Sequence, residues 1–323
     1  MKQPIMYIGT IGQSVWRSED LGSSWQRASD GIFAEADIRA IAVDPSDSSV
    51  VFAGTENGLY RTADGAETWQ LVDSEMNDLQ VWAIEISVKN PNTIFVGTCP
   101  SDLFKSTDGG KTWTRLDVEL ADECAGGAII PRVTSIAIDP EDDQIVYAGI
   151  EIDGFRRSMD GGKNWETINE GLSSLDIHGI SVIPGQPKKI IVATNNDVCR
   201  MDNLKYWTPL TVKDYLPWSY ARAVLYCPNG ENRVYVGAGN GPPGDEGGIF
   251  YSVDCGDSWK QADLGIMSNS TIWNFACNDH TEGLIMAYSV SGQIFRSMDH
   301  GNSWQKLIRE FGEVRALAIA SRS

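Results

Sequence analysis

The sequence lacks the features of several large classes of protein. No run approaches the roughly 18 apolar residues of a membrane-spanning helix, and no apolar signal segment precedes the first expected strand. Acidic residues outnumber basic ones by 44 to 26, which gives a formal net charge of −18. A chain of this sign repels nucleic acid and anionic membrane surfaces, so we expect neither as a partner. We expect a cytoplasmic, globular protein.

Metal and cofactor motifs are also missing. The chain has only three histidines, no pair of cysteines at CxxC spacing and no glycine-rich phosphate loop. We therefore expect no metal and no organic cofactor. Six scattered cysteines are expected to be reduced, packed thiols. They are Cys99, Cys124, Cys199, Cys227, Cys255 and Cys277.

A motif of the form Ser-x-Asp-x-Gly-x-x-Trp recurs along the whole chain. Its seven copies begin at residues 18, 62, 106, 158, 200, 252 and 297, so they are spaced 42 to 52 residues apart. Five copies are well formed. The copy at 62 has Ala66 in place of a glycine, and the copy at 200 keeps only Asp202 and Trp207. Repeats of this length indicate a solenoid or a propeller.

The motif resembles the Asp-box of the sialidase-like (BNR repeat) β-propellers, and the pattern is close to that of seven-bladed photosystem II stability/assembly factor-like proteins. The chemistry of the motif is structural. Ser and Asp side chains accept hydrogen bonds from backbone N–H groups of a turn, Gly permits a positive φ, and Trp buries a large ring. One carboxylate per box is too few for Ca²⁺. We expect no catalytic role for the boxes.

Each repeat also shows the same order of strands. In the fourth repeat they are expected at residues 133–139, 145–150, 154–158 and 165–168. The chain begins with a second strand at residues 6–9 and ends with a first strand at residues 314–319. The sequence therefore predicts an all-β, seven-bladed β-propeller. Residues 1–323 form one domain, which closes when the C-terminal strand joins the N-terminal three.

The Asp-box turns and the turns after the first strands share one face of such a propeller. The opposite face carries the long connections at 114–132 and 211–221 and the tip at 239–248, and variable loops on one face commonly carry function. Counting back from the turn that ends each first strand gives one column of residues. It contains Arg39, Trp82, Thr134, His178, Arg222, Trp273 and Arg315.

A second polar column stands two residues earlier in each first strand. It contains Asp37, Gln80, Arg132, Asp176, Tyr220, Thr271 and Glu313, and the residues between the two columns are all apolar. Because side chains alternate along a strand, both columns are expected on the same side of it. First strands line the axis of a propeller. We therefore expect a polar funnel at the mouth of the axis on the loop-rich face.

Arginine is concentrated in this funnel. Three of the seven residues of the first column are arginines, although the chain has only fifteen among 323 residues. In an acidic protein, such guanidinium groups favour an anionic partner, most simply a carboxylate held by two hydrogen bonds. One hypothesis is a cofactor-free enzyme, most simply a hydrolase, that acts on a small aromatic or cyclic carboxylate.

In the enzyme hypothesis the funnel residues divide into two groups. The predicted substrate-binding residues are Arg39, Arg132, Arg222, Arg315, Trp82, Trp273 and Asp37, with the two indoles as walls of a flat apolar pocket. The predicted catalytic residues are His178, Asp176, Tyr220, Glu313 and Glu151, with His178 or Asp176 moving a proton.

Two alternatives stay open. Arg39, Arg222 and Arg315 can form structural ion pairs with Asp37, Asp176 and Glu313. The same face can instead serve a non-catalytic scaffold that binds an acidic or C-terminal peptide of a protein partner. A deep pocket with converging titratable groups favours the enzyme, and a flat face with spread arginines favours the scaffold. Glu56 and Glu151, at two strand tips, either reach the funnel or are solvated loop residues, and the solvated interpretation is preferred.

The resemblance adds expectations of its own. Sialidases hold the substrate carboxylate with three arginines, use a tyrosine with a glutamate as a nucleophile pair, and use an aspartate as acid and base. Arg39, Arg222 and Arg315 are similar to that triad, and Tyr220 with Glu313 or Glu151 is similar to the pair. The Arg-Ile-Pro motif of sialidases is absent, so sialidase activity itself is not expected. The photosystem II factor-like proteins are binding scaffolds, which implies a protein partner.

Overall fold

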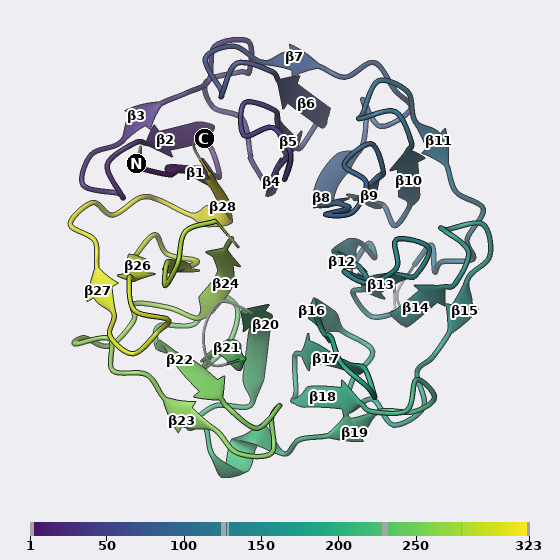
Figure 1. The fold of residues 1–323 in the computed structure, drawn as a ribbon, viewed down its shortest axis with the longest axis vertical. Helices are drawn as coiled ribbons and strands as arrows, with labels where there is room; N and C mark the ends of the chain where they lie inside the picture. The colour runs from purple at the N-terminus through teal and green to yellow at the C-terminus, as the bar shows by residue number, and fades with distance from the viewer. Residues whose placement is uncertain (1–2, 124–126, 128, 228–231, 279, 322–323) are drawn as a thin grey trace.

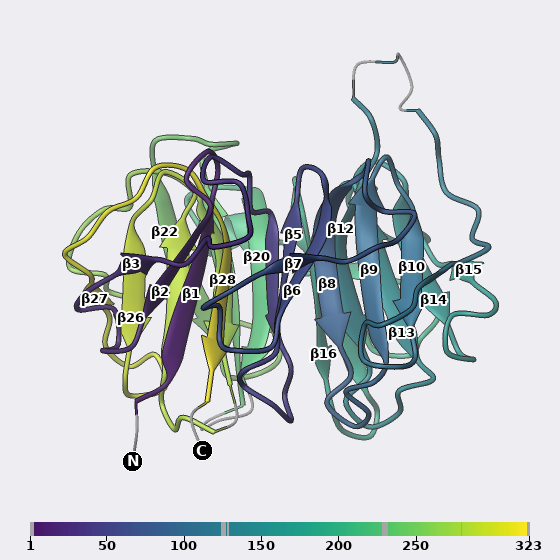
Figure 2. The same cartoon turned by 90° about the horizontal axis from the view of Figure 1, so that it is seen from above.

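Each repeat folds into one four-stranded antiparallel sheet, and the seven sheets stand as blades around a central axis (Figure 1). The computed structural model describes residues 3–123, 127, 129–227, 232–278 and 280–321. Seen from the side, strands β8 and β28 run downward from the upper face of the ring to the lower one (Figure 2). The helix found in the described ranges, η1 (Val212–Asp214), is far too short to cross a membrane.

The strands of each blade are named from the axis outward. Blade 1 contains β28 (Val314–Ala320), β1 (Ile5–Thr10), β2 (Val15–Ser18) and β3 (Gln26–Arg27). Blade 2 contains β4 (Ala40–Val43), β5 (Val51–Thr55), β6 (Gly58–Thr62) and β7 (Gln70–Leu71). Blade 3 contains β8 (Gln80–Ile86), β9 (Ile94–Cys99), β10 (Leu103–Ser106) and β11 (Thr114–Arg115). Blade 4 contains β12 (Val133–Ile138), β13 (Val146–Ile150), β14 (Gly154–Ser158) and β15 (Glu166–Thr167).

The last three blades repeat this order. Blade 5 contains β16 (Ile177–Ile183), β17 (Lys189–Thr194), β18 (Val198–Met201) and β19 (Thr208–Pro209). Blade 6 contains β20 (Tyr220–Cys227), β21 (Arg233–Gly239), β22 (Gly247–Ser252) and β23 (Lys260–Gln261). Blade 7 contains β24 (Ile272–Cys277), β25 (Ile285–Ser289), β26 (Ile294–Ser297) and β27 (Gln305–Lys306).

The two ends of the chain close the ring, as the sequence predicts. Strand β28 pairs antiparallel with β1, with Leu317 opposite Ile8 and Ile319 opposite Met6. Blade 1 therefore combines the C-terminal strand with the N-terminal three. Because the ring is continuous, the inner strands stand against one another around the whole axis, and each blade buries its two faces against its neighbours.

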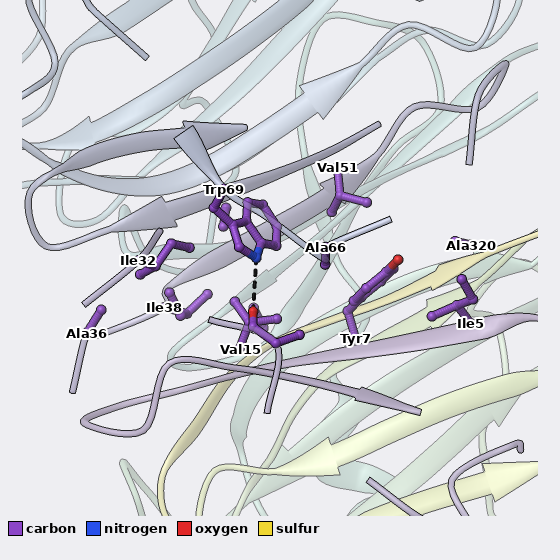
Figure 3. Packing of buried hydrophobic residues seen from close by; sticks show 13 residues of the cluster. Ile5, Tyr7, Val15, Ile32, Ala36, Ile38, Val51, Ala66, Trp69 and Ala320 are labelled. Atoms are coloured by element: carbon purple, nitrogen blue, oxygen red, sulfur yellow. Dashed lines mark hydrogen bonds between the residues drawn. The ribbon is translucent and has the colours of Figure 1, made fainter. Parts of the chain in front are cut away.

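The Asp-boxes have the structural role that their composition predicts. In the box at 106, the Ser106 hydroxyl accepts a hydrogen bond from the backbone N–H of Gly110, and Asp108 accepts bonds from the N–H groups of Lys111 and Thr112. The degraded box at 62 makes the same turn hydrogen bonds to Thr62 and Asp64, and the indole of its Trp69 donates to the Ala28 carbonyl at 2.9 Å (Figure 3). That indole lies in the apolar contact between blades 1 and 2.

The apolar residue between the two polar columns anchors each first strand. All seven of these residues are completely buried: Ile38, Val81, Val133, Ile177, Ala221, Ile272 and Val314. A glycine in the second strand of the preceding blade admits several of them. A Cβ atom added to Gly54 would lie 2.5 Å from Cγ1 of Val81, and one added to Gly97 would lie 2.5 Å from Cγ1 of Val133. Glycine thus permits this close approach between blades.

The strict alternation expected along the first strands is wrong at one position. In six blades the strand pairing shifts by one residue at the first-column residue, for example between Ile177 and Gly179, so that His178 is an extra residue. In blade 2, the N–H of Arg39 donates to the Gly54 carbonyl, although Gly54 already pairs with Ala40. These β-bulges redirect the first-column side chains at the mouth of the axis.

Candidate functional site

The seven first strands surround the axis (Figure 1), and their starts, which carry the two polar columns, lie at its upper mouth. We call this site the arginine mouth. It comprises Arg39, Arg132, Arg222, Arg315, Trp82, Trp273, His178, Asp176 and Tyr220. The arginines come from blades 2, 4, 6 and 1, so the positive groups are distributed over the mouth.

Each of the two indole rings contacts one guanidinium group from each of its two neighbouring blades. The ring of Trp82 lies 4.6 Å from the Arg39 guanidinium carbon and 4.2 Å from that of Arg132. The corresponding distances from the ring of Trp273 are 4.2 Å for Arg222 and 4.3 Å for Arg315. Cation–π contacts of this kind hold the arginines in place. The indoles therefore support guanidinium groups, and their role as walls of a flat apolar pocket stays a prediction from the sequence.

Three of the four arginines are ion-paired. Arg39 binds Asp37 at 3.0 Å, Arg132 binds Glu151, and Arg315 binds Glu313. The structural pairing that the sequence left open thus applies to Arg39 and Arg315.

Both strand-tip glutamates reach the funnel, and the preferred interpretation of them as solvated loop residues is wrong. Glu151 pairs with Arg132, and Glu56 accepts a hydrogen bond from the Asp37 backbone N–H at 2.9 Å.

Arg222 differs from the other three arginines. It is 9% exposed, and among the described residues it has no carboxylate within ion-pairing distance. One of its amino groups donates to the His178 carbonyl at 3.4 Å, and its Nε is buried without a partner. Burial lowers the pKa of Arg222, and the charge of Arg315 acts in the same direction. The site therefore contains a guanidinium group that lacks an anion.

His178 is fixed from both sides. Its Nδ1 lies 2.9 Å from the Ala221 carbonyl, which can only accept, so Nδ1 carries a proton. Its Nε2 lies 3.3 Å from a carboxylate oxygen of Asp176. Burial raises the pKa of Asp176, but hydrogen bonding to His178 and the positive charges of His178, Arg222 and Arg132 leave the net pKa below the ordinary value. Asp176 therefore remains an anion that faces the imidazole.

Tyr220 stands beside this pair, and its ring centroid lies 5.2 Å from that of His178. Burial raises the pKa of Tyr220, and the charge of Arg222 opposes this effect only in part. The tyrosine is therefore a neutral phenol at physiological pH. Glu313, the other predicted member of the nucleophile pair, is held by Arg315.

The remaining column residues satisfy local hydrogen bonds. Gln80 accepts from the Trp82 indole at 3.1 Å, Thr134 donates to the Gly149 carbonyl at 3.1 Å, and Thr271 donates to the Gly241 carbonyl at 2.6 Å. Sequence reasoning missed Tyr288, which is completely buried and donates its hydroxyl to the Arg315 carbonyl. It belongs to a second strand, which the alignment of first strands did not include.

Cysteine and metal chemistry find no support in the described part of the chain. Burial raises the pKa of the Cys99 thiol, and the five described cysteines form no disulfide. Cys124 lies outside the described residues. Within those residues, no group of three or more His, Cys, Asp or Glu side chains is arranged to hold a metal ion.

The sequence and the fold of this chain were compared with those of known proteins. A family model described as Sortilin-Vps10 (Sortilin, neurotensin receptor 3) matches residues 13–145. A search of curated proteins found no match. Among solved structures, the chain is similar to the GH74 enzyme of Niastella koreensis, with 18% identity and a TM-score of 0.65. The match covers 83% of this chain and 45% of that one, so this chain spans less than half of the enzyme's length.

Two further structures are described as YCF48. One is bound to D1 peptide and matches with 16% identity and a TM-score of 0.60, over 84% of this chain and 81% of that one. The other, from Cyanidioschyzon merolae, matches with 16% identity and a TM-score of 0.57, over 86% of each chain. The repeated boxes, the closed ring of seven blades and these likenesses together show a seven-bladed β-propeller fold built from Asp-box-like repeats.

Proposed function

We propose that this protein is a binding scaffold that holds a carboxylate-bearing peptide segment of a protein partner on the arginine mouth. The observation that carries the proposal is Arg222, a buried guanidinium group with no carboxylate partner among the described residues. An incoming carboxylate supplies the missing anion and hydrogen-bond acceptors. Arg315, which shares the Trp273 ring with Arg222, lies beside the same position.

The distribution of charge favours a peptide over a compact substrate. Guanidinium groups from four blades surround the axis, and two of them rest on each indole. An extended segment can contact several such groups at once, whereas a small carboxylate contacts one or two. The solved YCF48 complex with D1 peptide supports this choice, because it shows a propeller of similar fold that binds a peptide.

The contacts within the arginine mouth support catalysis less than they support peptide binding. A general base needs a free lone pair, and both ring nitrogens of His178 face an oxygen atom. The Asp176 carboxylate is engaged by the imidazole of His178, and Glu151 and Glu313 are ion-paired with arginines. Cofactor-free hydrolysis of a small carboxylate remains a prediction from the sequence.

The experiment is a peptide-array screen followed by fluorescence anisotropy with the best binder. We expect the free-acid peptide to bind at least tenfold more tightly than its C-terminal amide if the terminus is the ligand. If an acidic side chain is the ligand, we expect the same tenfold loss of affinity when that Asp or Glu of the peptide is replaced by Asn or Gln. Arg222→Gln should remove this difference, and Arg157→Gln, on the third strand of blade 4, is the control. Equal binding of acid and amide forms throughout would refute the proposal.

A further inference from the structure

A cavity of about 670 Å³ opens at the end of the axis opposite the arginine mouth. The inner strands of four consecutive blades, β24, β28, β4 and β8, form its walls. Polar and apolar atoms contribute equally to its surface, and the apolar side chains that line it include Ile41, Val43, Ile84, Ile86, Leu317 and Ile319. This volume is within the range of sites that bind small organic molecules.

Glu85 lies between two of these apolar residues, Ile84 and Ile86. In the other three strands that line the cavity, the equivalent residues are alanines: Ala42, Ala276 and Ala318. Glu85 is half-buried, and among the described residues it has no ion-pair partner. Its carboxyl group accepts a hydrogen bond from the backbone N–H of Ile138 in the next blade.

That hydrogen bond requires an oxygen acceptor at this position. It does not require that the acceptor be an ionisable carboxyl group. At the equivalent position of blade 5, the hydroxyl of Ser181 accepts the corresponding N–H of Tyr226 at 2.7 Å. A neutral serine thus performs the same structural task. The capacity of Glu85 for a negative charge is left without a structural reason, and burying an unpaired charge is costly.

The cavity around Glu85 is lined by acidic side chains, in contrast to the arginine mouth. Among the described residues that line the cavity there is no lysine or arginine. The other titratable groups there are Asp44 and Asp47 in the turn after β4, Cys277, and His280 at the rim. Burial raises the pKa of Glu85 to about 8, which the Ile138 N–H opposes. An incoming cation would therefore find a carboxyl group that ionises in response to it.

We propose that this cavity binds a protonated organic amine, with the ammonium group on Glu85 and a hydrocarbon body against the isoleucine and leucine side chains. A bare metal ion fits less well, because the hard cations require several oxygen ligands and the residues on either side of Glu85 are apolar. Binding forms an ammonium–carboxylate pair. When Glu85 is protonated beforehand, its proton passes to the buffer.

Isothermal titration at pH 7 tests the proposal with hexylamine, 1-hexanol and hexanoate as probes. We expect hexylamine to bind the full chain at least tenfold more tightly than 1-hexanol, and hexanoate to show no binding. Glu85→Gln keeps the oxygen acceptor for Ile138 and should weaken hexylamine at least tenfold. Glu35→Gln, an exposed position, should leave its affinity unchanged.

A second measurement does not depend on the variant. Titrations of the wild-type protein in two buffers of different ionisation enthalpy should show close to one proton released per hexylamine bound at pH 7. Arg222→Gln should bind hexylamine normally, which separates this site from the proposed peptide site. Absence of hexylamine binding to the wild-type protein, equal affinity for amine and alcohol, or full affinity in Glu85→Gln would overturn the inference.

Discussion

Replacing Glu85 by glutamine should make the protein several kcal/mol more stable than the wild type at pH 9, and more stable by less than about 1 kcal/mol at pH 5. The substitution keeps the size of the side chain and an oxygen acceptor for the Ile138 N–H, but it removes the ionisable proton. The prediction therefore isolates the cost of charging one half-buried carboxyl group.

The direction of the pKa shift determines how the unfolding free energy changes with pH. The pKa of Glu85 rises from 4.5 to about 8 in the folded protein, because burial disfavours the charged form. The folded state thus holds the proton more tightly than the unfolded state. This stabilising contribution is fully present below pH 4.5 and is lost as the pH rises through 8. At about 1.4 kcal/mol per pH unit, the complete loss is roughly 5 kcal/mol, a large part of the stability of an ordinary domain.

Urea unfolding followed by tryptophan fluorescence at five pH values from 5 to 9 measures the effect. The difference in unfolding free energy between Glu85→Gln and wild type should grow from pH 5 to about pH 8, level off above it, and be several kcal/mol at pH 9. Glu35→Gln should follow the wild-type curve, because its side chain is exposed. Parallel curves for Glu85→Gln and wild type would show that Glu85 ionises without cost, and the reasoning about its burial would be wrong.

Two other substitutions and one deletion test the fold and the arginine mouth. Gly54→Ala places a Cβ atom 2.5 Å from Val81 and should lower the unfolding free energy by about 1–3 kcal/mol in urea titrations, whereas an unchanged midpoint would contradict the close approach. Trp273→Leu removes the cation–π support of Arg222 and should weaken peptide binding several-fold in the anisotropy assay; unchanged affinity would show that the indole does not position the guanidinium. Deleting residues 314–323 removes β28 and opens the ring, so we expect loss of cooperative thermal unfolding by circular dichroism, and a retained sharp transition would contradict closure by this strand.

The architecture was predictable because its determinants are local and repeated. An Asp-box such as that at Ser106 specifies a turn through hydrogen bonds within eight residues, so each copy can be recognised without knowledge of the rest of the chain. Closure was predictable from the phase of the repeat at the two ends. The column alignment was also effective: Arg39 contacts Asp37, His178 contacts Asp176, and Arg315 contacts Glu313, each two residues apart.

The pairing within the mouth was not predictable from the same pattern. The β-bulge at each first-column residue changes the direction of its side chain, and no residue type marks it in the sequence. The choice between Arg222 and His178 as the partner of Asp176 depends on that direction. The guanidinium contacts of Trp82 and Trp273 join residues of different blades, so a count along one strand cannot find them. Glu85 did have a signal, because extending the alignment three residues further places it among alanines.

One set of inner strands carries two sites of opposite charge. Strands β28, β4 and β8 present Arg315, Arg39 and Trp82 at one end of the axis and line the acid-bearing cavity at the other. Three residues separate Trp82 from Glu85, which is about 10 Å along a strand. At that distance, two unit charges interact by about 1.7 kcal/mol at the effective dielectric constant of roughly 20 that applies to protein sites, and physiological salt reduces this. The two ends are therefore close enough for a carboxylate at one and an ammonium group at the other to raise each other's affinity by up to about tenfold.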